Sequence, residues 1–418
     1  MFMLGPVSVL DCLAFCVFLA IQLPLQVGLL DTLGALIPCL PFLLIKLPLT
    51  FLRDRFLVPI HQQPAFVAVA TPFEDFVIRC VRFAFSNIPP RIGRVFFSKP
   101  VALPFLWFRL LRHGYLRSPV HWQEYEDGDL KRFKGLWIIQ DPAKRPDICI
   151  FYAHGGGFMM GSSYFYLEFL LTWLSLLSEA GYANPAIFSL EYTLVPDACF
   201  PTQLNQSAAA YEHVVDMVGG EASRVCVAGD SAGAGIMLTL LFHLARPVAK
   251  PPPLRRASYE PARALAAPPG YAVLISPWVT MVSPLHRNTE SDYLEASHLH
   301  SYARQYAGGG AGFVDDPVVS PGSCRDVAWW REAFPSRGAH VTYGSEEMLA
   351  AGIADLVGFL EDNDFKVTSR AEPGEVHAWP VASLFLCNTI EDRTKGLADI
   401  VRKIKENMAP SGRKTARG

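Results

Sequence analysis

One short stretch in the middle of the chain restricts the fold most strongly. Residues 225–235 read Val-Cys-Val-Ala-Gly-Asp-Ser-Ala-Gly-Ala-Gly, and an apolar helical pattern follows from Ile236 to Leu244. An apolar run that meets Gly-x-Ser-x-Gly and then a helix predicts a sharp strand–turn–helix corner. At such a corner the serine has strained backbone angles, and Gly229 and Gly233 let strand and helix approach closely. We therefore expect the Ser231 hydroxyl to point out over the end of a sheet.

A second glycine-rich stretch lies upstream. Residues 148–158 read Ile-Cys-Ile-Phe-Tyr-Ala-His-Gly-Gly-Gly-Phe, again an apolar strand pattern, and it ends in His154, Gly155, Gly156 and Gly157. Three glycines leave backbone N–H groups uncovered, which an oxyanion hole requires. The two motifs in this order predict a serine hydrolase, and a pair of unrelated glycine turns is the alternative.

Composition narrows the class of protein. The chain has 418 residues, enough for one large α/β domain with an appendage. Its formal net charge of −2 gives no reason to expect a nucleic-acid partner. The nine cysteines are odd in number and form no Cys-x-x-Cys pair, so neither a disulfide framework nor a zinc site is indicated.

The N-terminal segment 1–55 is predicted to be a hydrophobic membrane anchor. Residues 12–30 carry no charge and are long enough to cross the apolar core of a bilayer, and residues 32–45 are also uncharged but shorter. No basic residue precedes the run, which argues against a cleaved signal peptide. Prolines 24, 38 and 41 interrupt the pattern, so a hairpin competes with a single span, and a buried helix pair of a soluble protein is a third reading. A single span would leave the catalytic domain cytosolic, because Lys46, Arg53 and Arg55 follow it.

Residues 56–130 are predicted to form a basic, aromatic-rich cap near the membrane. Between residues 79 and 117 the chain has eight Lys or Arg, no Asp or Glu, and many aromatic residues. Basic residues interleaved with large apolar ones suit a lipid surface, where rings sink in and charges meet headgroups. A plain basic face on cap helices is the alternative.

From residue 131 to 408 the pattern predicts the catalytic domain. Strand and helix patterns alternate, beginning with strands at 135–139 and 148–153 and ending with a strand at 365–370. Repeated βα units imply a mostly parallel sheet flanked by helices. A proline-rich surface insertion is expected at 247–270 and a disordered basic tail at 409–418.

These motifs resemble the hormone-sensitive-lipase family of α/β hydrolases. The resemblance rests on His-Gly-Gly-Gly at 154–157, Gly-Asp-Ser-Ala-Gly at 229–233, and Glu-Tyr-Thr-Leu-Val-Pro-Asp at 191–197 followed by Phe-Pro. The last segment departs from the family's Asp-Tyr-Arg-Leu-Ala-Pro-Glu at Glu191 and Thr193. With its apolar N-terminus, the chain also resembles the arylacetamide deacetylases and, more closely, the fungal steryl acetyl hydrolases. This similarity implies an endoplasmic reticulum membrane location, although the related deacetylases place their catalytic domains in the lumen.

The resemblance and the chain order of the fold assign a triad. A serine needs an adjacent base, and this fold orders its residues as Ser, acid, His. His377 follows the last predicted strand, and the acid is expected just after the strand at 340–344, where the candidates are Glu346 and Glu347. The family places its acid about thirty residues before its histidine, which favours Glu347. The resemblance gives the oxyanion donors as the N–H groups of Gly156, Gly157 and Ala232.

Supporting roles follow for the flanking residues. His154 is expected to brace the glycine loop through a hydrogen bond, whereas no role for Asp230 follows from the sequence. Phe158 and Met159 are expected to line the acyl side of the site, and the cap the other side. No metal and no organic cofactor are implied, because triad and oxyanion hole are self-sufficient.

The sequence thus predicts a membrane-associated serine carboxylic ester hydrolase that acts on apolar esters with a short acyl group. Its partners would be an apolar small-molecule ester and membrane lipid. An amidase or N-deacetylase with the same triad is the first alternative, because attack and oxyanion stabilisation are common to both. A catalytically silent hydrolase fold used for binding is the second. The oligomeric state does not follow from the sequence.

Overall fold

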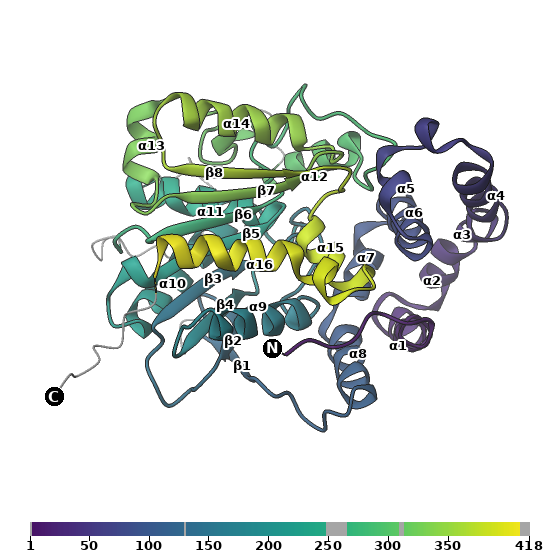
Figure 1. The fold of residues 1–418 in the computed structure, drawn as a ribbon, viewed down its shortest axis with the longest axis horizontal. Helices are drawn as coiled ribbons and strands as arrows, with labels where there is room; N and C mark the ends of the chain where they lie inside the picture. Colours follow the sequence, from purple (N-terminus) through teal and green to yellow (C-terminus); the bar gives the residue numbers. More distant parts are fainter. Residues whose placement is uncertain (1, 129–130, 248–265, 309–312, 410–418) are drawn as a thin grey trace.

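An eight-stranded sheet forms the centre of the protein (Figure 1). The computed structural model describes residues 2–128, 131–247, 266–308 and 313–409. The strand order is β1-β2-β4-β3-β5-β6-β7-β8. The pairs β1–β2 and β2–β4 are antiparallel, and every pair from β4–β3 to β7–β8 is parallel. The strands are β1 His121–Glu126, β2 Lys134–Ile139, β3 Ile148–Ala153, β4 Pro185–Leu190, β5 Val225–Asp230, β6 Tyr271–Ile275, β7 Ala339–Gly344 and β8 Val367–Glu372.

Helices cover both faces of this sheet because its central strands are apolar on both sides. Alternate residues of β3 belong to different core clusters: Ile148, Ile150 and Tyr152 face one side, and Cys149, Phe151 and Ala153 the other. The first face is covered by α9 Leu167–Glu179 and α16 Ile390–Asn407. The other is covered by α10 Thr202–Met217, α11 Ala232–Ala245, α12 Ala296–Tyr306, α13 Val327–Ala333 and α14 Ala350–Asp362. The predicted α/β-hydrolase sheet is confirmed.

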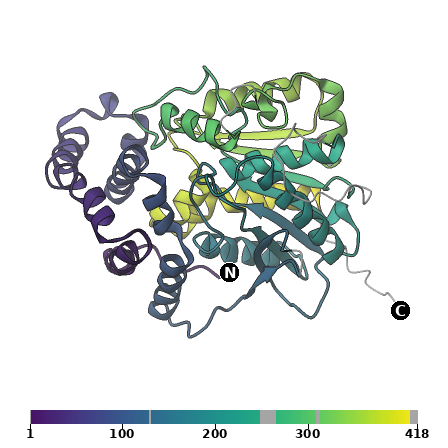
Figure 2. The same cartoon turned by 180° about the vertical axis from the view of Figure 1, so that it is seen from behind.

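The N-terminal helices form a separate layer beside one end of the sheet (Figures 1 and 2). Two apolar helices, Val9–Val27 and Leu29–Leu57, are each long enough to cross a membrane. The first is α1, and the second includes α2 Leu29–Leu36, α3 Cys39–Pro41 and α4 Leu47–Leu52, with π-helical turns at Phe42–Lys46 and Arg53–Leu57. The cap helices follow as α5 Ala65–Val69, α6 Pro72–Asn87, α7 Pro90–Phe97 and α8 Lys99–Arg112.

The start of the chain packs into the hydrolase core. Phe2 and Leu4 are buried in the same cluster as Leu110 of α8 and Ile400 of α16. The boundary expected at residue 55 therefore does not divide the chain into independent units. Most of the predicted insertion, at 248–265, and nearly all of the predicted tail, at 410–418, lie outside the described residues.

Basic residues of the cap are bound internally. Arg109 is fully buried and makes a bidentate pair with Glu168, at 2.8 Å for each nitrogen. Arg94 donates to the carbonyl of Met159 at 2.9 Å. Further acidic or carbonyl partners are found for Arg79, Arg82, Arg91, Lys99 and Arg112. Four of these side chains hold the cap to the hydrolase domain, namely Arg82, Arg94, Lys99 and Arg109, whereas the other three pair with aspartates of the N-terminal and cap helices. This pattern fits the alternative reading better than a surface for lipid headgroups.

Two sequence expectations at the sheet need correction. The apolar run at 270–279 predicts a strand over its whole length, but β6 ends at Ile275, because Ser276 turns with φ 44° and its hydroxyl joins the functional site. The antiparallel edge strand β1 was not predicted, since its residues are polar and partly exposed and give no apolar alternation.

Candidate active site

Ser231 stands at the corner between β5 and α11. Its backbone has φ 52° and ψ −120°, a conformation that non-glycine residues rarely adopt. Its N–H donates to the carbonyl of Ile275 at 2.9 Å, and its own carbonyl accepts from Trp278 at 3.1 Å. Neighbouring backbone thus holds the strained turn in place.

The small residues of the motif are sterically required. A Cβ on Gly233 would lie 2.1 Å from the carbonyl oxygen of Ala153, and one on Gly229 would lie 2.6 Å from the backbone of Gly233. Strand β3 and the start of α11 therefore approach so closely that only glycine fits. This explains Gly-x-Ser-x-Gly in packing terms.

The glycine loop after β3 lies against the same corner. Gly156 and Gly157 have φ 107° and 63°, and a Cβ on Gly156 would lie 2.1 Å from the Met160 carbonyl. The structure gives the N–H groups of these two glycines no hydrogen-bond acceptor among the described residues. Two backbone donors thus lie free beside Ser231 at the surface of one cavity.

Asp230 ties the glycine loop to the corner. Its carboxylate accepts from the Gly155 N–H at 2.8 Å and from the hydroxyls of Tyr152 at 2.6 Å and Tyr166 at 2.7 Å. Burial raises the pKa of Asp230, and the two tyrosine hydrogen bonds act against that shift. Sequence reasoning found no role for this residue, because its partners come from elements far along the chain.

His154 braces the loop from the other side. Its Nδ1 lies 2.8 Å from the Gly155 carbonyl, and its ring stacks on Tyr192 at 4.4 Å. Tyr192 in turn donates to the His154 carbonyl at 3.0 Å. The departure at Glu191 is accommodated, since its carboxylate accepts from the Ser163 N–H at 2.7 Å.

His377 and Glu347 meet behind the corner. Nδ1 of His377 lies 3.6 Å from Oε1 of Glu347, beyond hydrogen-bond reach, and neither atom has a hydrogen bond among the described residues. Such contacts often tighten only when substrate binds. The other Glu347 oxygen accepts from the Ser276 hydroxyl at 2.5 Å and from the Gly344 N–H at 3.0 Å. Glu346 instead accepts from Ser345 at 3.2 Å, so Glu347 is the one beside the imidazole.

Two further residues position these groups. Asp292 is buried and accepts from the His377 N–H at 3.1 Å and the Met348 N–H at 2.8 Å, so it joins the two functional loops. The Ser276 hydroxyl accepts from the Ala378 N–H at 2.9 Å while it donates to Glu347. Sequence reasoning missed both, since neither belongs to a motif.

Negative charge around His377 sets its protonation. Burial lowers the pKa of the imidazole, but the Glu347 carboxylate, followed by Asp292 and Asp230, outweighs burial, and the net pKa is raised above its usual value. The imidazole is thus a stronger base than an isolated histidine.

One cavity of about 260 Å³ brings the site together. Ser231, His377 and the three glycines share it with apolar side chains from the cap helices α6 and α7 and from α15 Trp379–Leu386, namely Val77, Ile78, Val81, Phe85, Phe97, Val381 and Phe385. The expectation for Phe158 and Met159 is wrong, because neither lines this cavity. Phe158 is fully buried and stacks on Tyr306 at 3.8 Å.

Comparison with known proteins agrees with this architecture. A sequence profile of the alpha/beta hydrolase fold matches residues 150–381. Mouse hormone-sensitive lipase is 34% identical over 106 residues, covering 25% of this chain and 13% of the lipase. Steryl acetyl hydrolase 1 of Saccharomyces cerevisiae is 26% identical over 227 residues, 50% of this chain and 47% of that protein. The chain thus covers less than half of either relative.

A solved structure extends the similarity in space. An esterase from the bacterial hormone-sensitive lipase family superimposes with a TM-score of 0.58 at 21% identity, covering 81% of this chain and 99% of that chain. The profile match spans more than half of the chain. The chain therefore belongs to the family of alpha/beta hydrolase fold proteins that this profile describes, and within that family it is similar to hormone-sensitive lipases.

Proposed function

We propose that the protein is a membrane-associated serine hydrolase that cleaves apolar carboxylic esters with a short acyl group. The observation that carries this proposal is the convergence of Ser231, His377 and the glycine loop on one cavity, with Glu347 beside the histidine. An acetyl-hydrolase of Streptomyces hygroscopicus, 30% identical over 40% of this chain and 50% of its own length, supports the short acyl group by its name.

In the proposed reaction, the Ser231 oxygen attacks the ester carbonyl while His377 takes the hydroxyl proton. The carbonyl oxygen becomes an oxyanion, which accepts hydrogen bonds from the N–H groups of Gly156, Gly157 and Ala232. His377 then gives its proton to the leaving alcohol, and an acyl-serine remains. Water, deprotonated by the same histidine, releases the acid and restores Ser231. Glu347 orients the imidazole and stabilises its charged form.

The cavity supports the substrate class. Its volume of about 260 Å³ falls below the ~300–1,000 Å³ of pockets that enclose drug-sized ligands. It therefore suits a small acyl group with part of an alcohol, but not a long acyl chain. The wall from α6 and α7 offers apolar contact only, which favours an alcohol without charge.

Membrane association is proposed from the two long apolar helices near the N-terminus. The endoplasmic reticulum is proposed as the location because of the resemblance to the anchored deacetylases and steryl acetyl hydrolases.

A labelling experiment joined to a chain-length series tests this function. A fluorophosphonate probe should label the protein at Ser231 and fail on Ser231→Ala. With nitrophenyl esters, kcat/KM should be highest for acetate or butyrate and fall steeply for octanoate and palmitate. Absence of labelling would overturn the catalytic proposal, whereas a preference for palmitate would overturn only the substrate class.

A further inference from the structure

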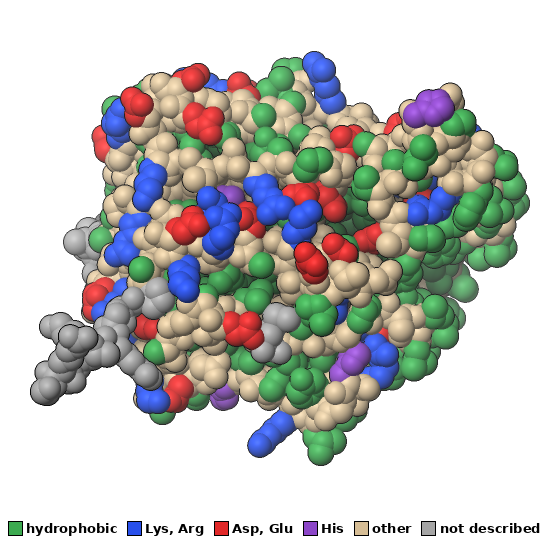
Figure 3. Space-filling view, in the orientation of Figure 1, with side chains coloured by type: hydrophobic (Ala, Val, Ile, Leu, Met, Phe, Trp, Pro, Cys, Tyr) green, Lys and Arg blue, Asp and Glu red, His purple; other side chains and the backbone are tan. Residues whose placement is uncertain are grey.

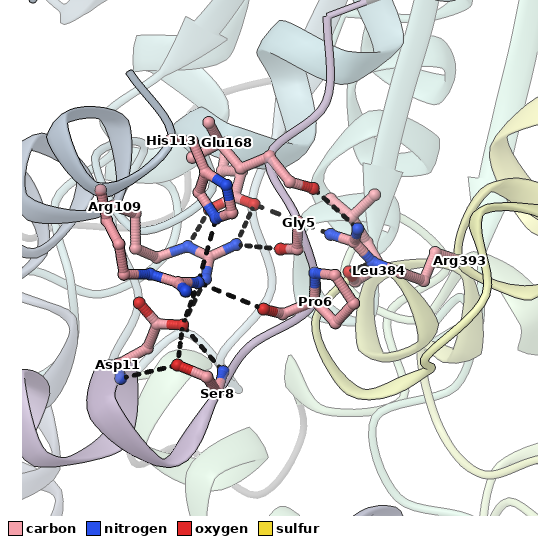
Figure 4. A network of polar contacts seen from close by, with 11 residues as sticks. Gly5, Pro6, Ser8, Asp11, Arg109, His113, Glu168, Leu384 and Arg393 are labelled. Carbon is pink, nitrogen blue, oxygen red and sulfur yellow. Dashed lines mark hydrogen bonds and ion pairs between the residues drawn. The ribbon is translucent and has the colours of Figure 1, made fainter. Parts of the chain in front are cut away.

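The start of the apolar N-terminal segment, residues 9–57, is fixed to the hydrolase domain by a buried charge network (Figure 4). Asp11 of α1 is fully buried, 3.1 Å from Arg109 and 2.7 Å from Arg112. Arg109 carries the bidentate pair with Glu168 of α9. Separating buried partners leaves an uncompensated charge, which is strongly unfavourable. The start of α1 therefore stays on the catalytic domain.

The turn and the second end are fixed to the same body. Asp31, just after the turn at Gly28, pairs with Arg91 of α7 at 3.1 Å. Asp54 pairs with Arg79 of α6 at 3.0 Å. Along its length α1 also packs on the cap, with Leu19 and Leu23 buried against α7 and α8. Start, turn and end of the segment thus contact one rigid face.

The outer side of the same segment is apolar and uncovered. Leu30 is 84% exposed, Leu25 73% and Leu44 72%. Most of the exposed large apolar side chains of the described residues lie between Val9 and Leu57. Figure 3 shows apolar side chains gathered at the end of the molecule where α1 to α4 lie. A patch of this extent marks an interaction site.

We infer that residues 9–57 form a hairpin embedded in one leaflet of a bilayer, with the N-terminus and the catalytic domain on the same side of the membrane. A single span would carry the start of α1 to the far side and break the Asp11 network. A hairpin lying in the membrane plane keeps all three fixed points and still places the outer apolar side in lipid. This inference rests on the proposed membrane association, and it excludes a protein partner as the main occupant of the patch.

The hairpin also lies next to the wall of the candidate active site. One side of α6 contacts the hairpin, where Phe83 stacks on Phe42 at 3.9 Å. Val77, Ile78 and Val81 of the same helix line the cavity with Ser231. Helix α6 therefore lies between the hairpin and the cavity that holds Ser231.

Glycosylation mapping tests the topology. Full-length protein is made in microsomes with an Asn-Gly-Thr acceptor tag on a flexible linker before Met1, or after Gly418. The two tags should give the same result, both modified or both unmodified, in protein that resists carbonate extraction. Modification of one tag only would show a single span and overturn the inference. Hydrolysis of a soluble acetate ester by the same microsomes reports the proposed chemistry separately.

Substitution of the outer side tests the lipid contact. Replacing Leu13, Ile21 and Leu44 by Gln should reduce binding to phosphatidylcholine vesicles more than tenfold, since each substitution removes an apolar side chain from the lipid contact. The matched control replaces Leu116, Met217 and Ile390, which are 88%, 41% and 62% exposed elsewhere, and should bind normally. Turnover of the soluble ester should be unchanged in both. Equal vesicle binding by the two triple variants would overturn the inference.

Discussion

Helices α11 and α1 are both apolar, yet their environments are opposite. All but the last two of the fourteen residues of α11 are buried, since the sheet and its neighbouring helices surround it. Of α1 only three residues are buried, Asp11, Leu19 and Leu23. Six of its large apolar side chains are exposed, among them Val9 at 72% and Leu13 at 59%. Apolar side chains are more stable when they are removed from water. Either surrounding protein or lipid can cover them, depending on where the helix lies in the fold.

The difference in burial between α11 and α1 corresponds to different roles of the two helices. The helix that follows Ser231 has to hold a strained corner in one position, and burial on every side provides that rigidity. The N-terminal helices instead pack one side on the cap and leave the other side exposed, which we propose faces lipid. Substitutions at the corner and in α11 test the first role, and substitutions in residues 9–57 test the second.

The largest effect is expected at the corner itself. Ser231→Ala and His377→Ala should each lower kcat by ~10⁵–10⁶-fold, because the two groups act as a unit. The melting temperature should stay within a few degrees of the parent protein, since neither side chain is part of the apolar core. Near-normal turnover in either variant would contradict the triad.

The two adjacent glutamates provide the next contrast. Glu347→Gln should lower kcat by ~10³–10⁴-fold, because an amide no longer holds the imidazole in the required tautomer. Glu346→Gln should remain within about twofold, since its carboxylate bonds only to Ser345 among the described residues. Steady-state kinetics on the same ester decides, and the opposite ranking would move the acid by one residue.

Substitution of one leucine on each of the two apolar helices tests the difference in burial directly. Leu240→Gln in α11 should destabilise the protein by ~3–5 kcal/mol, because the site is fully buried and the amide finds no partner. Leu13→Gln in α1 should change the free energy of unfolding by less than ~0.5 kcal/mol in detergent solution. Denaturant unfolding followed by tryptophan fluorescence measures both. Equal losses would mean that the outer side of α1 is covered by protein.

Charged residues of the N-terminal segment allow a finer contrast. Asp11→Asn should cost ~3–5 kcal/mol, because it leaves buried Arg109 with one anionic partner fewer. Asp31→Asn should cost ~0–1 kcal/mol, since its pair with Arg91 is exposed. The same unfolding measurement applies. A negligible loss for Asp11→Asn would show that the start of α1 is not docked.

The smallest effect concerns pH. The base must be neutral, and the pKa of His377 is raised above its ordinary 6.5, so kcat/KM should fall with decreasing pH at a midpoint above 6.5. Asp292→Asn removes one negative charge and should move that midpoint to lower pH. Asp326→Asn, at the N-cap of α13, is the control and should leave the midpoint unchanged. A purely structural role of Asp292 would lower activity at every pH and leave the midpoint where it was.

The sequence predicted the parts of this molecule that depend on local chemistry. The sheet and the family are confirmed. Both could be predicted because the glycine-rich corners at 154–157 and 229–233 allow few backbone conformations. The triad remains a prediction, but the structure brings Glu347 and His377 together as expected. The positioning roles of Asp292 and Ser276 could not be predicted, because their partners lie more than fifty residues away in the sequence. Phe158 was misassigned because its ring turns into the core against Tyr306.

The contact between Arg393 and the carbonyl of Leu4 joins residues 389 positions apart. Leu4 thus finds this partner only when α16, far along the chain, has been made. Until then the docking surface for Phe2 and Leu4 is incomplete, and loop closure over such a distance slows folding. The apolar residues 9–57 are synthesised before α16 and are exposed to water during this interval. Insertion into a membrane during synthesis would remove these residues from water, and synthesis without a membrane should favour aggregation of the protein.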